Sequence, residues 1–124
     1  MSLLEENAIT RLASVNNVDV NTATPTVLYR VPFDKTCVIT SIIIHSASSD
    51  LDTASISIGY NSATYDDIIA DATHVELADD TKYSALQPKT GAALGTGGSE
   101  LCLKANTLQG AAATLTVEVF GYLF

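Results

Sequence analysis

The strongest constraint on the fold is the stretch from Lys35 to Ser46, which is rich in β-branched residues and carries apolar side chains at both odd and even positions. β-branched side chains favour strands because they pack well on a pleated surface. A strand that is apolar on both faces is covered from two sides, so we expect a central strand of a β-sandwich. Simple alternation places two sets of side chains on opposite faces: Cys37, Ile39 and Ile43 on one, and Val38, Ile42 and Ile44 on the other.

Length and composition predict a single all-β domain. The chain has 124 residues, of which 47% are hydrophobic and 16% charged. This composition is too apolar for a disordered chain, and the frequent Ser, Thr, Val and Ile residues favour strands. A chain of this size is long enough to bury a real core.

Alternating segments predict further strands on both sides of the central one. A short turn at Asp34 leads from the first of them into the central strand, so these two are expected to pair as a hairpin. A single helical turn is expected to carry Ile68 and Ile69 inward. The total is seven strands, or eight with an N-terminal one, which predicts a jelly-roll or related Greek-key sandwich. The further strands are expected at residues 26–32, 53–60, 74–77, 82–86, 99–105 and 112–124.

The first 25 residues are expected to form an N-terminal arm or edge strand that precedes a sandwich domain of residues 26–124. Leu4, Ala8, Ile9 and Leu12 have the spacing of a short amphipathic helix, and an extended arm or an edge strand near residues 8–14 is equally compatible. Such a short segment takes its order from the surface on which it packs. We expect neither a signal peptide nor a membrane anchor.

The net charge of −8 is concentrated in one part of the chain. Residues 50–80 hold eight acidic residues and no Lys or Arg, and the remaining six acidic residues balance six basic ones. A chain with this charge does not attract polyanions, so nucleic-acid and anionic-membrane partners are disfavoured. The acidic segment is expected to form solvated loops.

The sequence contains no motif for catalysis or for a cofactor. His45 and His74 have no nucleophilic serine motif around them. Cys37 and Cys102 are expected to be buried free thiols, although a disulfide remains open until their separation is known. Paired carboxylates for glycoside hydrolysis need an aromatic cleft, and the chain has no Trp. An enzyme is therefore not expected.

Four carboxylates are weak candidates for a calcium site: Asp50, Asp52, Asp66 and Asp67. They would supply oxygen ligands only if their loops converged at one end of the sandwich, and the usual calcium-loop pattern is absent. The Gly-rich segment 88–99 also lacks the spacing of a phosphate-binding loop. A long Gly-rich loop on a small sandwich is instead typical of an interaction surface.

Three stretches carry a resemblance to a known group of proteins. They are the Thr-Val-Leu-Tyr-Arg-Val-Pro strand at 26–32, the apolar strand 38–44 with Lys35-Thr36 before it, and the closing strand 114–123. Together they resemble the small jelly-roll virion proteins of tailed bacteriophages, of the head decoration or cement type. The resemblance covers about residues 26–124 and lies in strand pattern, without a diagnostic motif.

This resemblance implies a non-enzymatic structural protein that binds the major capsid protein on the surface of a phage head and is made in the host cytoplasm. A homotrimer is favoured and a homodimer remains open. A carbohydrate- or receptor-binding module of a phage tail or fibre is the alternative. We expect contacts through the arm, the Gly-rich loop and the aromatic C-terminal strand, at these residues: Leu4, Ile9, Leu12, Leu94, Phe120, Tyr122 and Phe124.

Overall fold

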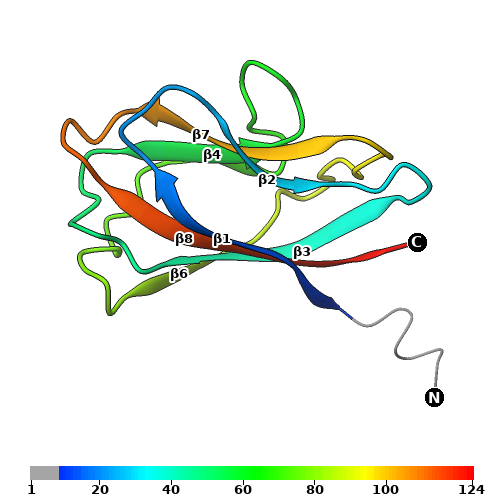
Figure 1. The fold of residues 1–124 in the computed structure, drawn as a ribbon, viewed down its shortest axis with the longest axis horizontal. Helices are drawn as coiled ribbons and strands as arrows, with labels where there is room; N and C mark the ends of the chain where they lie inside the picture. Colours follow the sequence, from blue (N-terminus) through cyan, green and yellow to red (C-terminus); the bar gives the residue numbers. More distant parts are fainter. Residues whose placement is uncertain (1–8) are drawn as a thin grey trace.

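The computed structural model describes residues 9–124, which form eight β-strands and no helix (Figure 1). None of these residues therefore belongs to a helix that could cross a membrane. Within the segment expected to be an arm or an edge strand, residues 10–19 are a strand. The strands are β1 (Thr10–Asp19), β2 (Thr26–Arg30), β3 (Cys37–His45), β4 (Ser55–Gly59), β5 (Ile69–Ala72), β6 (Tyr83–Leu86), β7 (Glu100–Thr107) and β8 (Thr114–Leu123).

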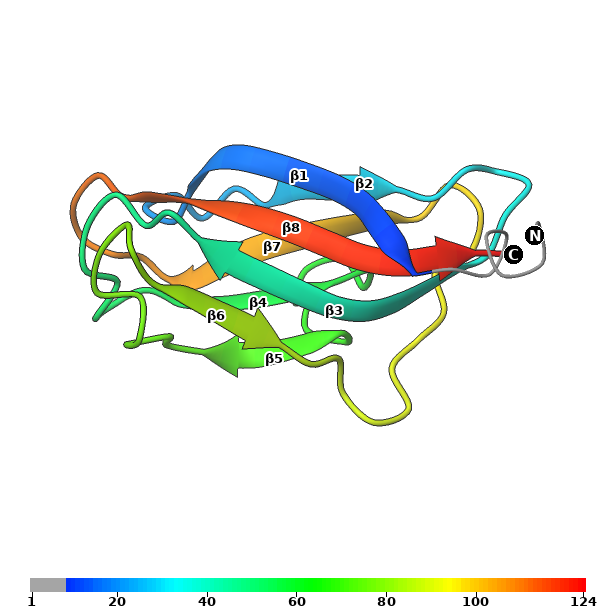
Figure 2. The same cartoon turned by 90° about the horizontal axis from the view of Figure 1, so that it is seen from below.

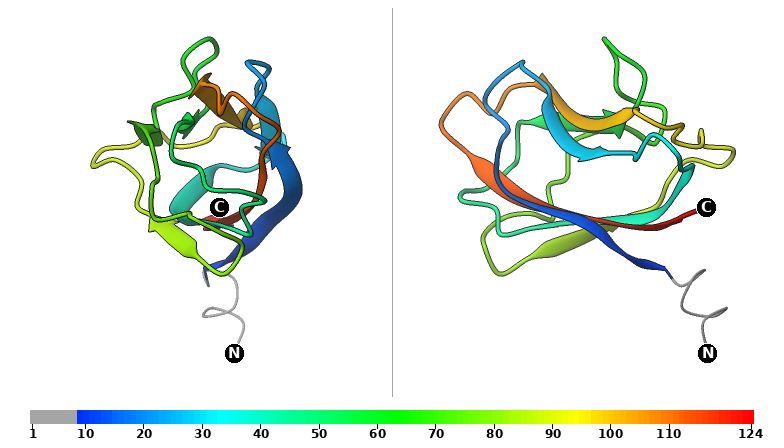
Figure 3. Two further views of the ribbon diagram at one scale, coloured as in Figure 1. Left: turned by 90° about the vertical axis from the view of Figure 1, so that its left-hand side faces the viewer. Right: turned by 45° about the vertical axis from the view of Figure 1, so that its right-hand side comes forward.

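The strands form two antiparallel sheets that face each other. Sheet A has the order β1-β8-β3-β6 and sheet B the order β2-β7-β4-β5. Figures 1 and 2 show the two layers from perpendicular directions, and the left view of Figure 3 shows them curving around a shared interior. The predicted all-β sandwich is confirmed.

The strand pairing is nested along the chain. β1 pairs with β8, β2 with β7, β3 with β6 and β4 with β5, as if one long hairpin had been wrapped onto itself. The additional pairs β3·β8 and β4·β7 complete each sheet. This arrangement is the jelly roll: successive strands change sheet at every connection except the one between β4 and β5.

The predicted hairpin between residues 26–32 and the central strand is wrong, because β2 lies in sheet B and β3 in sheet A. The turn at residues 31–36 crosses from one layer to the other. A short turn signal tells where the chain reverses direction, and it does not tell whether the next strand joins the same sheet.

Two local predictions for residues 61–77 also need correction. Residues 74–77 form a turn, closed by a hydrogen bond from the Leu77 amide to the His74 carbonyl, and the strand in this region is β5. No helical turn forms at residues 61–70, although Ile68 and Ile69 are buried as expected. Four-residue apolar patterns are too short to separate a turn from a strand.

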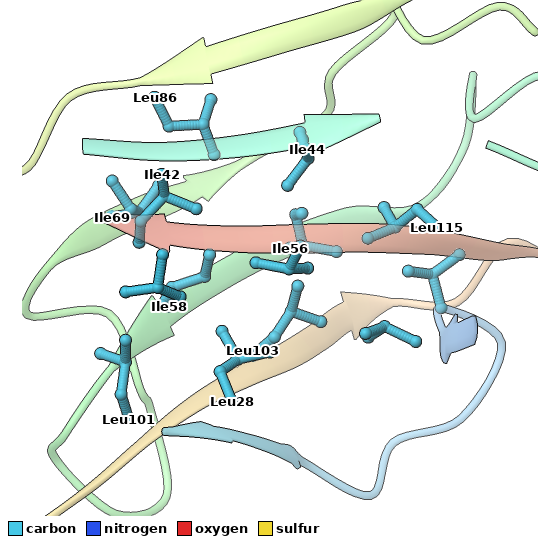
Figure 4. Packing of buried hydrophobic residues seen from close by; sticks show 14 of the residues in the cluster. Leu28, Ile42, Ile44, Ile56, Ile58, Ile69, Leu86, Leu101, Leu103 and Leu115 are labelled. Atoms are coloured by element: carbon cyan, nitrogen blue, oxygen red, sulfur yellow. The ribbon is translucent and has the colours of Figure 1, made fainter. Parts of the chain in front are cut away.

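The core lies between the sheets and consists mainly of Ile, Leu and Val side chains. Figure 4 shows Ile42 and Ile44 of β3 with Leu115 of β8 on one side, and Ile56 and Ile58 of β4 on the other. Full burial of one such side chain stabilises the fold by about 1.5–3 kcal/mol. The core therefore accounts for the strong apolar signal of the central strand.

A β-bulge at Thr40 exchanges the predicted faces of the β3 residues that follow it. The register to β8 shifts between Ile39 and Ser41, so Ile42 and Ile44 are buried in the core with Cys37 and Ile39. Val38 and Ile43 share the other face, where they are partly exposed. Simple alternation fails here because the bulge inserts one extra residue.

Gly121 of β8 is pressed against β3, which gives the first testable prediction. A Cβ atom at this position would overlap the carbonyl oxygen of Val38. Backbone has nowhere to move inside a paired sheet, so Gly121→Ala should lower the free energy of unfolding by about 1–3 kcal/mol, as overpacked sites do. Urea denaturation measures this change.

The control for this substitution is Ser14→Ala on the neighbouring strand β1, where the side chain is exposed. It should change the free energy of unfolding by no more than about 0.5 kcal/mol. Equal stabilities of Gly121→Ala and the unmodified protein would contradict the close approach of β3 and β8.

Candidate functional site

The two ends of the sandwich differ in chemistry. The apolar end is formed by Ile9, the β2–β3 loop (31–36), the β6–β7 loop (87–99) and Phe124. The acidic end is formed by the loops 20–25, 46–54, 73–82 and 108–113. Figure 2 shows the C-terminus and the β2–β3 loop together at the right-hand end, opposite the loops that join β7 to β8 and β5 to β6.

Backbone hydrogen bonds fix the segments of the apolar end to one another. Thr36 and Phe124 exchange two bonds, at 2.8 and 2.9 Å, so the C-terminus is docked on the β2–β3 loop. Cys37 and Gly95 exchange two more at the same distances, which ties the Gly-rich loop to the start of β3. The chain's last residue and its most glycine-rich loop are therefore held on either side of residues 36–37.

Phe33 is the most exposed large apolar side chain described, with 84% of its surface accessible. It stands at the tip of the β2–β3 loop against Gly97 and Gly98. A Cβ at Gly98 would lie 2.7 Å from a carbon of the Phe33 ring, and one at Gly97 would overlap the Phe33 carbonyl. The glycines thus let the loop backbone support the ring from one side while its other side faces solvent.

Exposed apolar side chains gather at this end. Eight large apolar residues are exposed among the described residues, and four of them lie here: Ile9, Phe33, Leu94 and Phe124. The ring of Tyr122 extends the cluster, with its centroid 6.3 Å from that of Phe124. Grouped exposed apolar side chains mark interaction sites more often than single ones do.

The acidic end differs mainly in its charge, since three exposed apolar side chains, Val75, Tyr83 and Leu108, also lie there. Its four loops are bound together, for example by Gln109, whose side-chain amide donates to the Asp50 carbonyl and to the Asp52 carboxylate. These loops carry five acidic residues and one basic residue, Lys82. The segments of the apolar end carry one acidic and two basic residues, and the loop 60–68, which leaves β4 at that end, adds Asp66 and Asp67. The charge predicted for the 50–80 segment is therefore largely gathered at one end of the molecule.

The outer faces of the two sheets also differ. The loop 60–68 folds back over β4, where the Ser57 hydroxyl donates to the Thr64 carbonyl, so Ser57 is fully buried although it points away from the core. The alternation of Ala54, Ile56 and Ile58 with polar residues predicts one solvated face for this strand, but the loop covers that face. The outer face of sheet A is open, with partly exposed apolar side chains at Val38, Ile43, Phe120 and Tyr122.

One polar network crosses this open face. Arg11 of β1 donates to Glu118 of β8 at 2.8 Å, and His45 Nε2 of β3 lies 2.7 Å from the other carboxylate oxygen. Hydrogen bonds from Arg11 and then His45 hold the pKa of Glu118 below its usual value. Glu118 is thus paired within the molecule, whereas Asp19, the other carboxylate of this face, lies beside Thr114 at the end of β1.

The structure brings most of the expected interface residues together. Ile9, Leu94 and Phe124 are exposed at the apolar end, and Phe120 and Tyr122 lie on the adjoining outer face of sheet A. Leu12 is partly buried and packs against the core, which leaves less of it available for contact. Leu4 lies outside the described residues.

The calcium candidates are not brought together. Asp50 and Asp52 precede β4 and Asp66 and Asp67 follow it, so the two pairs lie at opposite ends of a strand that alone spans about 13 Å. Asp67 accepts a hydrogen bond from the Tyr60 amide at 2.7 Å, which gives it a structural role. Within residues 9–124, no group of three or more His, Cys, Asp and Glu residues is placed to hold a metal ion.

Both thiols are free and buried, as predicted. Cys37 points into the core from sheet A, whereas Cys102 points away from the core in sheet B, opposite to its neighbours Leu101 and Leu103. Burial raises the pKa of each thiol. Protonated, buried thiols are unreactive, so neither is a candidate nucleophile.

Sequence reasoning missed Phe33, the most prominent residue of the apolar end. The available signal was a large aromatic residue between Pro32 and Asp34 in a tight connection. A side chain at the tip of such a short turn points away from the sandwich and has no route to the core. Its exposure therefore follows from the turn itself.

No known protein family matches the sequence, and no curated protein matches it. Two solved structures have a similar fold. One is a chain in the acidic stable capsid of Helicobacter pylori bacteriophage KHP30, with a TM-score of 0.54 and 10% identity over 95% of this chain and 96% of that one. The other is a chain in the capsid asymmetric unit of cyanophage Pam1, with a TM-score of 0.52 and 12% identity over 94% and 86%.

These matches cover most of both chains in each pair, so the similar chains have about the same length as this one. At such low identity the likeness is one of fold. The protein therefore shares its jelly-roll fold with chains found in two phage capsids.

The Arg11–Glu118–His45 network gives a prediction about pH. Because the folded protein lowers the pKa of Glu118, the network stabilises the fold above the usual glutamate pKa, and this stabilisation is lost as the pH falls through the lower folded value. Glu118→Gln should reduce the free energy of unfolding at pH 7 by about 0.5–1 kcal/mol, the range for exposed ion pairs of good geometry. The difference should shrink to near zero at pH 3.

Denaturant titrations of both proteins at the two pH values make this measurement. The matched control is Glu100→Gln, which removes a more exposed ion pair with Arg30 on the opposite sheet. It should cost less at pH 7. A Glu118→Gln deficit that is unchanged at pH 3 would contradict an electrostatic role for the network.

Proposed function

We propose that this protein is a structural component of a phage virion, a head decoration or cement protein that binds the outside of the capsid shell and stabilises it. It acts by binding, without catalysis, and its partner is the major capsid protein. The observation that carries the proposal is the whole-chain match of its jelly roll to chains in two phage capsids.

The charges and surfaces of the molecule support this role. Interfaces are depleted of unpaired charge at their centres. The apolar end exposes several apolar side chains, and on the outer face of sheet A the central carboxylate, Glu118, is paired with Arg11 and His45. A shell offers many identical sites. Modest contacts, repeated over a lattice and multiplied by oligomer avidity, can therefore stabilise it.

The protein assembles as a homo-oligomer, with a trimer favoured over a dimer, and the outer face of sheet A is the surface that meets a second copy. A protein with a net charge of −8 repels its own copies, so they can approach only where negative charge is absent or paired. Glu118, the carboxylate near the centre of this face, is paired with Arg11 and His45, and the face's other carboxylate, Asp19, lies at its edge beside Thr114. Ile43 lies at its centre, between Glu118 of β8 and Ala85 of β6.

Shell binding is tested with purified protein and phage heads that lack decoration. The protein should co-sediment with the heads, saturate at a fixed ratio to the major capsid protein, and raise the temperature at which the heads rupture. Proteins that bind a folded state stabilise it by mass action, which gives the second effect its physical basis. Absence of saturable binding to such heads would overturn the proposed function.

Self-association is tested by solution mass. Light scattering should give a multiple of 13.0 kDa, and Ile43→Gln should lower that mass because it places an amide at the centre of the contact face. Val27→Gln is the matched control, since Val27 is an exposed β-branched residue on the opposite sheet, and it should leave the mass unchanged. A monomer in the unmodified protein, or equal effects of both variants, would contradict this surface assignment.

A further inference from the structure

We infer that the protein binds the shell through its apolar end. Phe33 inserts into an apolar pocket of an uncharged protein surface, and the acidic end points away from the shell. The inference rests on the proposed function and deepens it, since it names the docking surface and the chemistry of the shell that receives it. The occupant of the apolar end is the shell protein, and a second copy of this chain is an alternative that the experiment separates.

The distribution of charge favours this orientation. The segments of the apolar end carry Asp34, Lys35 and Lys89, and the adjoining loop 60–68 adds Asp66 and Asp67, so this end carries less negative charge than the acidic end. The acidic end carries five acidic residues against Lys82. Docking by the acidic end would remove several unpaired carboxylates from water, which costs free energy at each of them. Docking by the apolar end requires little charge desolvation.

Phe33 has the properties of an interface anchor. Large aromatic side chains that fill a pocket at the centre of an interface supply much of its binding free energy. The backbone that carries the ring is fixed before binding, because hydrogen bonds from Gly98 to Val31 and from Val31 to Ser99 join the β2–β3 loop to the Gly-rich loop. A pre-organised anchor loses little conformational entropy on binding.

The surrounding residues complete the contact. Leu94 is supplied by the same Gly-rich loop, and Phe124 by the C-terminus that is bonded to Thr36. Three segments far apart in the sequence thus bring exposed apolar side chains to the same end of the molecule. The right-hand view of Figure 3 shows the C-terminus and the adjoining loops at one end of the molecule.

The direct experiment compares Phe33→Ser with Val75→Ser for affinity to undecorated heads. Val75 is the matched control, because it is also an exposed apolar residue on a loop, 64% accessible, but at the acidic end. Phe33→Ser should weaken binding about tenfold or more, as loss of an anchor residue does. Val75→Ser should bind as the unmodified protein does.

The outcomes separate this inference from the proposed function. If the unmodified protein does not bind heads, the proposed function fails. If it binds and both variants bind equally well, or Val75→Ser is the weaker binder, the orientation is wrong and the function stands. If Phe33→Ser lowers the solution mass and leaves head affinity intact, the apolar end joins copies of this chain, and the inference is overturned.

A second experiment does not depend on the removal of an anchor. Leu94→Cys and Val75→Cys introduce one exposed thiol at either end, and the unmodified protein, whose two thiols are buried, is the background control. When the variants are bound to heads, maleimide labelling of Cys at position 94 should be suppressed and labelling at position 75 should match that of the free protein. Equal labelling at both positions, or protection of position 75 alone, would overturn the orientation.

Discussion

The pairing of β3 with β8 is the interaction on which the rest of the structure depends. It places the last strand of the chain between β1 and β3 and so completes sheet A. The close approach at Gly121 and the bulge at Thr40 set its register, and the register decides that Ile42 and Ile44 enter the core. A side chain at position 121 would force these two strands apart.

The same pairing gives the molecule its two unlike ends. Because β8 runs to the start of β3, Phe124 reaches Thr36 and bonds to it, and Cys37 is bonded in turn to the Gly-rich loop. The apolar end is thereby built from backbone contacts, which leave Phe33 and its neighbours free to meet a partner. The alternating connections of the jelly roll carry most of the acidic loops to the other end. Fold topology, more than local sequence, therefore separates apolar from charged surface.

Strand positions could be predicted from the sequence wherever apolar and polar residues alternated over a long stretch. β8 followed its predicted alternation throughout. Pairing between distant strands was not readable, since the turn at Asp34 looks the same whether β2 and β3 share a sheet or face each other. The bulge at Thr40 has no local sequence signature, so simple alternation predicted the wrong relative faces for the residues that follow it in β3. Candidate contacts at Leu94 and Phe124 were found from loop composition and aromatic content, whereas Phe33 needed the loop's geometry.

Imaging of phage heads incubated with this protein by cryo-electron microscopy would test the central claim most directly. The account predicts added density at regular lattice positions on the outer surface, each feature fitted by the eight-stranded sandwich with the Phe33 loop and the C-terminus against the shell. The acidic loops should point to solvent. Saturated heads without such density, or with the sandwich seated on its acidic loops, would contradict it.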